Sequence, residues 1–174
     1  PTPVHPSGPP PQHYFPDVAR DSEWVREQLS PLIPRLEERL AMLSGGRPVV
    51  PLDRPRPHRL ATVREMSAGY GAPTHVDAYV LSEGLASLFE NTDRATQLSW
   101  YVVLQLPGSG GELEVASRCG ESDRVIPLEV GDGVLFDGGR LQHRVTSVAS
   151  EPARITVGGF AGLARSRDSL YYWG

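Results

Sequence analysis

From residue 59 onward the chain is a succession of short runs rich in β-branched and aromatic residues, and this pattern constrains the fold more than any other feature. Gly, Pro, Asp or Ser separates most of the runs, as turns between strands require. We expect eight strands, over residues 59–66, 74–81, 98–106, 112–117, 124–128, 133–136, 143–148 and 154–160. Only residues 82–90 favour a short helix between them. Strands without long intervening helices predict a sandwich or barrel rather than βαβ units.

The N-terminal part has a different pattern. Residues 1–16 contain seven prolines, which disfavour helix and central strand, and we expect a Pro-rich lead-in over residues 1–20. Apolar residues then recur every three or four positions, which predicts helices over 22–29 and 31–43, the second capped by Ser30. The expected fold is mainly β with supporting N-terminal helices (α+β), as one domain over 21–174 whose β core spans about 59–160.

Composition excludes several classes of function. The net charge of −4 argues against a nucleic-acid partner, and no apolar run approaches the roughly 20 residues of a membrane span. A single cysteine, Cys119, excludes an internal disulfide and a cysteine-built zinc site. The single cysteine favours a reducing, cytoplasmic setting, and no signal peptide is evident, although the chain opens at Pro1 rather than Met.

Two predicted strands carry potential metal ligands. His75 and Asp77 are two positions apart, so in a strand their side chains share a face and can converge on one ion. His143 begins a later predicted strand. Two imidazoles and one carboxylate leave three adjacent coordination positions open, which suits non-haem Fe(II). Each motif alone also fits an ordinary reading, an exposed polar strand face for the first and an isolated histidine for the second.

Arg154 and Thr156 form a further candidate pair on the strand that follows His143. They share one face, and a buried guanidinium beside a hydroxyl can bind a carboxylate of a dicarboxylic acid through charge-assisted hydrogen bonds. The alternative is a surface arginine on an edge strand. The apolar flanks, Ile155 and residues 157–160, favour a buried strand instead.

Taken in order, these motifs resemble the Fe(II)/2-oxoglutarate dioxygenases of the prolyl-4-hydroxylase-like branch. The resemblance covers roughly residues 59–160. It rests on His75-x-Asp77, Gly110-Gly111-Glu112-Leu113, Val130-Gly131-Asp132 with Phe136, His143-Arg144-Val145 and Arg154-x-Thr156. The pair formed by Leu98-Ser99-Trp100 and Gly110-Gly111-Glu112-Leu113 is similar to small bacterial enzymes that oxidise amino acids.

The resemblance implies a double-stranded β-helix (a jelly roll, cupin-like) with His75, Asp77 and His143 as iron ligands. Arg154, assisted by Thr156, would pair with the distal carboxylate of 2-oxoglutarate. Such enzymes use Fe(II), 2-oxoglutarate and O₂, release succinate and CO₂, and remove a hydrogen from the substrate. Related halogenases have Gly or Ala in place of the aspartate, so that chloride takes its position. The presence of Asp77 therefore favours hydroxylation.

One position departs from the family pattern. Many relatives carry a tyrosine nine residues before the first ligand, where this chain has Met66. Another hydroxyl, from Ser99 or Tyr101, would have to contact the cosubstrate instead. The expected substrate is an amino acid or a derivative. A peptidyl or carrier-bound residue, or a cupin-like protein that binds a metal or ligand without turnover, stays open as an alternative.

Two remaining features have two readings each, and a third has one. The residues after the first ligand strand belong either to a substrate-covering lid or to an ordinary solvated helix and loop; they are Glu83, Glu90, Asp93 and Arg94. The aromatic run 171–173 either packs in the core or lines the substrate pocket. His58, like the two histidines in the lead-in, has no partner at metal-ligand spacing and is expected to play no part in a metal site.

Overall fold

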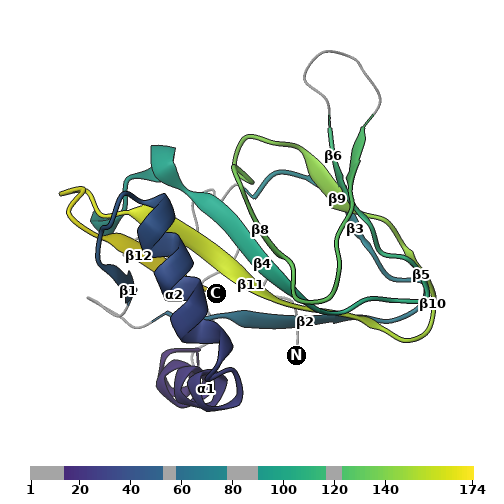
Figure 1. The fold of residues 1–174 in the computed structure, drawn as a ribbon, viewed down its shortest axis with the longest axis horizontal. Coiled ribbons are helices and arrows are strands. Elements are labelled where there is room, and N and C mark those ends of the chain that lie inside the picture. The colour runs from purple at the N-terminus through teal and green to yellow at the C-terminus, as the bar shows by residue number, and fades with distance from the viewer. Residues whose placement is uncertain (1–13, 53–57, 78–89, 117–122) are drawn as a thin grey trace. The chain divides into compact units, whose positions relative to one another are not determined.

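The computed structural model describes residues 14–52, 58–77, 90–116 and 123–174, drawn in colour in Figure 1. Strands predominate, as expected, and the described part forms two compact units. Of the described residues, the helical unit comprises 14–52, 58–61, 90–97 and 159–174, and the β unit comprises 62–77, 98–116 and 123–158. Strand β11 (Arg154–Leu163) contributes to both. Within the described ranges, neither helix is both long and apolar enough to cross a membrane.

The helical unit contains α1 (Tyr14–Gln28) and α2 (Leu32–Leu43). Helix α2 contacts β1 (Val49–Pro51), which pairs in parallel with β12 (Leu170–Trp173). Strand β12 in turn pairs with the second half of β11. The buried apolar side chains of this unit include Val18, Val25, Ile33, Leu40, Leu52, Phe160, Tyr172 and Trp173.

The helix boundaries differ from those expected. Helix α1 begins at Tyr14, eight positions before the predicted start, so residues 14–20 of the predicted lead-in are helical; residues 1–13 lie outside the described part. Pro16 is tolerated because it falls in the first turn, whose N–H groups have no partner within the helix. The N-cap of α2 is Pro31 rather than Ser30, and its cap makes no side-chain hydrogen bond.

The aromatic run 171–173 packs in the core of the helical unit. Trp173 stacks on Phe160 with ring centroids 6.1 Å apart, and both pack with Leu52. Tyr172 is fully buried and its hydroxyl donates to Glu37 of α2. Of the two readings of this run, core packing is the one observed.

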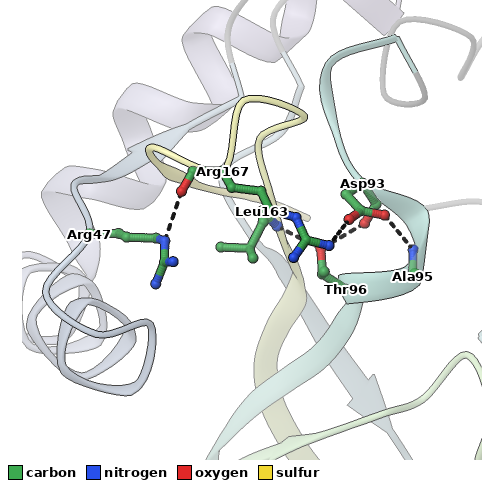
Figure 2. A network of polar contacts seen from close by, with 6 residues as sticks. All are labelled: Arg47, Asp93, Ala95, Thr96, Leu163 and Arg167. Carbon is green, nitrogen blue, oxygen red and sulfur yellow. Dashed lines mark hydrogen bonds and ion pairs between the residues drawn. The ribbon is translucent and has the colours of Figure 1, made fainter.

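A polar network fixes the segment that follows the undescribed residues 78–89 (Figure 2). Asp93 caps the 3-10 helix η2 (Arg94–Thr96) and accepts a 2.7 Å hydrogen bond from Arg167. Arg167 has a positive φ of 60°, a conformation that these contacts help to hold. The network joins Arg47, Asp93, Ala95, Thr96, Leu163 and Arg167. Asp93 therefore has a structural role, which agrees with the ordinary-loop reading of this segment.

His58 is buried in the helical unit at 5% exposure, and burial lowers the pKa of its imidazole from 6.5 to about 4. The unfolded chain takes up this proton near pH 6.5, whereas the folded chain takes it up only near pH 4. Folding stability therefore falls as pH drops through this window, by about 3 kcal/mol in full. We expect His58→Gln to remove most of this fall in urea unfolding at pH 7 and 4.5. If the free energy of unfolding falls between pH 7 and pH 4.5 by the same amount in His58→Gln as in wild type, His58 is not the cause of the fall.

The β unit contains strands of two main sheets and a two-stranded ribbon. Strands β2 (Thr62–Met66), β4 (Leu98–Gln105) and β8 (Gly133–Phe136) belong to a six-stranded sheet with the order β1-β12-β11-β4-β8, in which β2 pairs with β11. The other sheet has the order β3 (Ala72–His75), β9 (His143–Val145), β6 (Leu113–Val115), β7 (Arg124–Ile126). The ribbon pairs β5 (Ser109–Gly110) with β10 (Val148–Ser150).

The predicted strands match this arrangement with shifted ends. Residues 133–136 form a strand as expected, whereas the run 143–148 divides into β9 and β10. The run 74–81 is described only to residue 77, and its strand ends at His75. Of the predicted helix over 82–90, all but the last residue lie outside the described part. The two- and three-residue strands β5 and β1 are too short to give a periodic signal.

Candidate metal centre and cosubstrate site

The pairing register of β3 and β9 brings the two histidines together. His75 lies directly opposite His143 in this antiparallel pair, and the ring centroids are 4.3 Å apart. Opposed residues on adjacent strands project to the same face of the sheet, so both imidazoles face one point. His143 is 6% exposed, and the edge of its ring packs against Phe136 at 4.9 Å.

Asp77 completes the cluster from just beyond the end of β3, rather than from within the strand as expected. Its backbone N–H donates to the carbonyl of Gly138 at 2.7 Å, which holds this short segment against the loop after β8. Oδ1 lies 3.5 Å from Nε2 of His75, and Oδ2 lies 3.5 Å from Nε2 of His143. One ligand atom from each of the three residues lies within 4.8 Å of the others.

Backbone hydrogen bonds select the ring nitrogens that face the centre. Nδ1 of His75 lies 2.6 Å from the carbonyl of Pro73, and Nδ1 of His143 lies 2.9 Å from the carbonyl of Leu141. A carbonyl can only accept, so Nδ1 carries the proton in each neutral ring. Nε2 therefore presents a lone pair toward Asp77 in both residues. Two such nitrogens and a carboxylate oxygen fit a divalent transition metal, and the set matches the 2-His-1-carboxylate arrangement of non-haem Fe(II).

Arg154 begins β11 and is 3% exposed. Among the described residues, no carboxylate lies within ion-pair distance of its guanidinium, and Nε has no hydrogen-bond partner. Burial accordingly lowers the pKa of this guanidinium from its ordinary value. A buried cation without an anionic partner is costly, so this position suits the carboxylate of a ligand. Thr156, also buried, follows two residues later on the same strand.

Tyr101 of β4 adds a hydroxyl to this position. The guanidinium carbon of Arg154 lies 5.3 Å from the centre of the Tyr101 ring, and the buried hydroxyl has no hydrogen-bond partner within the described ranges. Burial raises the pKa of this hydroxyl, while the neighbouring guanidinium opposes the shift. Met66, the position of the missing family tyrosine, lies directly opposite Arg154 on β2. Of the two candidate hydroxyls, Tyr101 is therefore the one beside Arg154.

Sequence reasoning does not find the contacts of Ser99 and Gly138. Ser99 donates a hydrogen bond to Asp77 rather than serving the cosubstrate position. The sequence shows that Ser99 and Tyr101 are two positions apart and so share a face of β4, but the residues that each contacts depend on strand pairing. The five predicted site residues all lie in the β unit, and the structure places them as two clusters, one of metal-ligand type and one around Arg154.

The fold and these clusters define a class, the jelly-roll Fe(II)/2-oxoglutarate-dependent oxygenases. A family model, that of the carrier-protein-independent halogenase WelO5, matches residues 9–174. The chain therefore belongs to this family, which lies within that class. The match confirms the resemblance to Fe(II)/2-oxoglutarate dioxygenases seen in the sequence. Comparison with curated proteins finds no match.

Two solved structures share the fold. An N-substituted L-amino acid dioxygenase from Burkholderia ambifaria AMMD is 15% identical over 93% of this chain and 69% of its own, with a TM-score of 0.62. Its complex with alpha-KG gives 16% identity, 92% and 68% coverage and a TM-score of 0.58. A Burkholderia pseudomallei 2OG-Fe(II) oxygenase family protein (18%, TM-score 0.42) and a Pseudomonas putida prolyl-4-hydroxylase (17%, TM-score 0.41) match 56% and 57% of this chain. The chain spans only 39% and 50% of their respective lengths.

Proposed function

We propose that this chain is a hydroxylase that inserts one oxygen atom into a C–H bond of a small molecule, an amino acid or a derivative. His75, Asp77 and His143 hold Fe(II), and Arg154 with Tyr101 and Thr156 binds the distal carboxylate of 2-oxoglutarate. The observation that carries this proposal is the convergence of three ligand atoms within 4.8 Å in a family of Fe(II)/2-oxoglutarate enzymes.

The bound iron and 2-oxoglutarate would supply the oxidising chemistry, in which O₂, 2-oxoglutarate and R–H give R–OH, succinate and CO₂. The chain's own residues hold and orient these reactants. Three ligands on one side leave adjacent positions for a bidentate cosubstrate and O₂. Arg154 fixes the far end of the cosubstrate, which holds its reacting end in a single orientation. The low dielectric around this buried guanidinium strengthens the charge-assisted hydrogen bonds that it makes.

Hydroxylation rather than halogenation is supported by Asp77. In a halogenase the corresponding position lacks a carboxylate and a halide binds there, whereas here the carboxylate lies 3.5 Å from both histidine Nε2 atoms. A negative oxygen in this place disfavours a second anion, because like charges in contact repel. Membership of a family described by a halogenase therefore does not require halogen transfer from this chain.

A structure that shares the fold supports the choice of substrate. The Burkholderia ambifaria protein that shares the fold acts on N-substituted L-amino acids, which favours an amino acid derivative here. A peptidyl or carrier-bound residue is the alternative with the same chemistry. Substrate contacts in this fold come from loops, which vary most between relatives.

The direct test incubates the Fe(II)-loaded protein with 2-oxoglutarate, O₂ and chloride against free and N-substituted amino acids. Products are read by mass spectrometry. We expect a product heavier by one oxygen atom, formed with succinate and lost in Asp77→Ala. A product that carries chlorine would overturn the hydroxylase assignment. Release of no succinate with any candidate would favour a cupin-like protein without turnover.

Tyr101→Phe should weaken 2-oxoglutarate binding, because it removes one hydrogen bond to a charged group while keeping the ring. Such a bond contributes about 1.5–3 kcal/mol, so the Kd should rise roughly 10- to 150-fold. Calorimetric titration of the metal-loaded, anaerobic protein measures this. Tyr70→Phe, at an exposed tyrosine of the same unit, is the matched control and should bind as wild type does. Equal affinity in both variants would remove Tyr101 from the cosubstrate site.

A further inference from the structure

The Asp77 carboxylate accepts a hydrogen bond from Ser99, a residue that is not one of the proposed metal ligands. Ser99 lies on β4, is 5% exposed, and donates its hydroxyl proton to Oδ2 of Asp77 at 2.5 Å. A hydrogen bond of this length to an ionised acceptor is at the strong end of the range. Because a serine on a strand has one side-chain torsion to set, the hydroxyl defines a fixed position for the carboxylate.

Gly138, in the loop after β8, lies next to the same carboxylate. Its carbonyl accepts the Asp77 N–H at 2.7 Å. A Cβ at this glycine would lie 2.4 Å from Oδ2 of Asp77 and 2.1 Å from Oγ of Ser99, so any side chain must displace one of these groups. The neighbouring Gly139 differs, since a Cβ there would meet only atoms 3.8 Å or more away. Of these two neighbouring glycines, Gly138 is therefore the one at which the absence of a side chain matters for Asp77.

We propose that Ser99 and Gly138 form a clasp that positions Asp77 and thereby reserves the third ligand position for the protein's own carboxylate. Ser99 engages Oδ2, which fixes the rotation of the carboxylate between the two histidines. Gly138 provides the space in which this arrangement fits. Without the clasp the carboxylate can rotate away, and a small anion gains access to its position. This inference rests on the proposed metal site and assigns two positioning residues to it.

The test uses Co(II) as a redox-stable replacement for Fe(II), because its visible absorption reports the ligands around the metal. Ser99→Ala and Gly138→Ala should each weaken Co(II) binding about 10- to 100-fold, the usual effect of losing a group that orients a ligand. The Co(II) spectrum of each of these two variants should differ from that of wild type. Added azide, a small anion, should change the spectrum of each variant further but leave that of wild type unchanged. Ser99→Thr, which keeps the hydroxyl, should restore wild-type affinity and spectrum. Gly139→Ala is the matched control and should behave as wild type.

The outcomes separate the clasp from the site on which it rests. If His143→Ala binds Co(II) as tightly as wild type, the proposed metal site is wrong. If His143→Ala loses Co(II) while Ser99→Ala keeps the wild-type affinity, spectrum and indifference to azide, the clasp is overturned and the site stands. Circular dichroism and thermal unfolding without metal show whether each variant is folded. Should Gly138→Ala not fold, the pair Ser99→Ala and Ser99→Thr decides the question.

Discussion

Replacing His143 with alanine should abolish Fe(II) binding and, with it, all succinate formation from 2-oxoglutarate. The centre has three protein ligands, and His143 contributes the buried one, directly opposite His75. Its loss leaves one imidazole and one carboxylate, both partly open to water. The effect should exceed the roughly 100-fold that removal of a group behind a ligand costs.

Anaerobic equilibrium dialysis with Fe(II) measures this loss directly. Arg144→Ala is the matched control, because Arg144 is the next residue of β9 and its exposed side chain pairs with Glu114. An exposed ion pair of this kind contributes at most about 1 kcal/mol, so the control should bind one Fe(II) as wild type does. Retention of stoichiometric iron by His143→Ala would contradict the assignment of this residue as a ligand.

Arg154→Met should have two effects of opposite sign. Without ligands the protein should become more stable, by roughly 1–4 kcal/mol, because an uncompensated buried cation is replaced by an apolar side chain of similar length. Binding of 2-oxoglutarate should weaken by about 2–5 kcal/mol, which is at least 30-fold in Kd. A residue that lowers stability yet is needed for binding is characteristic of a functional position.

Thermal unfolding of the metal-free protein and calorimetric titration of the metal-loaded protein measure the two effects. Arg124→Met is the control, since Arg124 lies on β7 in the other sheet and carries the same charge in an exposed position. It should change neither stability nor affinity to a comparable degree. If Arg154→Met binds 2-oxoglutarate as wild type does, the guanidinium is not the cosubstrate receptor, and the non-catalytic reading gains support.

Much of the candidate site is visible in the sequence because its signals are local. The two-residue spacing of His75 and Asp77 and of Arg154 and Thr156 follows the period of a strand. The apolar flanks of Arg154 correctly indicate that its strand is buried. The order of motifs identified the class, which the family model confirms.

The remaining parts depend on register and loop geometry, which local patterns do not encode. The sequence around His143 does not indicate that His143 pairs with His75. The sequence around Arg154 does not indicate that Arg154 lies opposite Met66. Asp77 reaches the centre from beyond the strand because a backbone contact to Gly138 holds it there. Ser99 and Tyr101 lie on the same strand, so the sequence alone does not show which hydroxyl lies beside Arg154. The pairing of the strands shows that Tyr101 does, whereas Ser99 contacts Asp77.

We expect one Fe(II) to bind to the β unit through His75, Asp77 and His143, and one 2-oxoglutarate to bind beside it through Arg154. Anaerobic binding of 2-oxoglutarate, measured with and without Fe(II), tests this expectation most directly. We predict one 2-oxoglutarate per chain in the presence of one Fe(II), and affinity at least 30-fold weaker in Arg154→Met. No binding at saturating Fe(II), or binding that is indifferent to both the metal and Arg154, would contradict it.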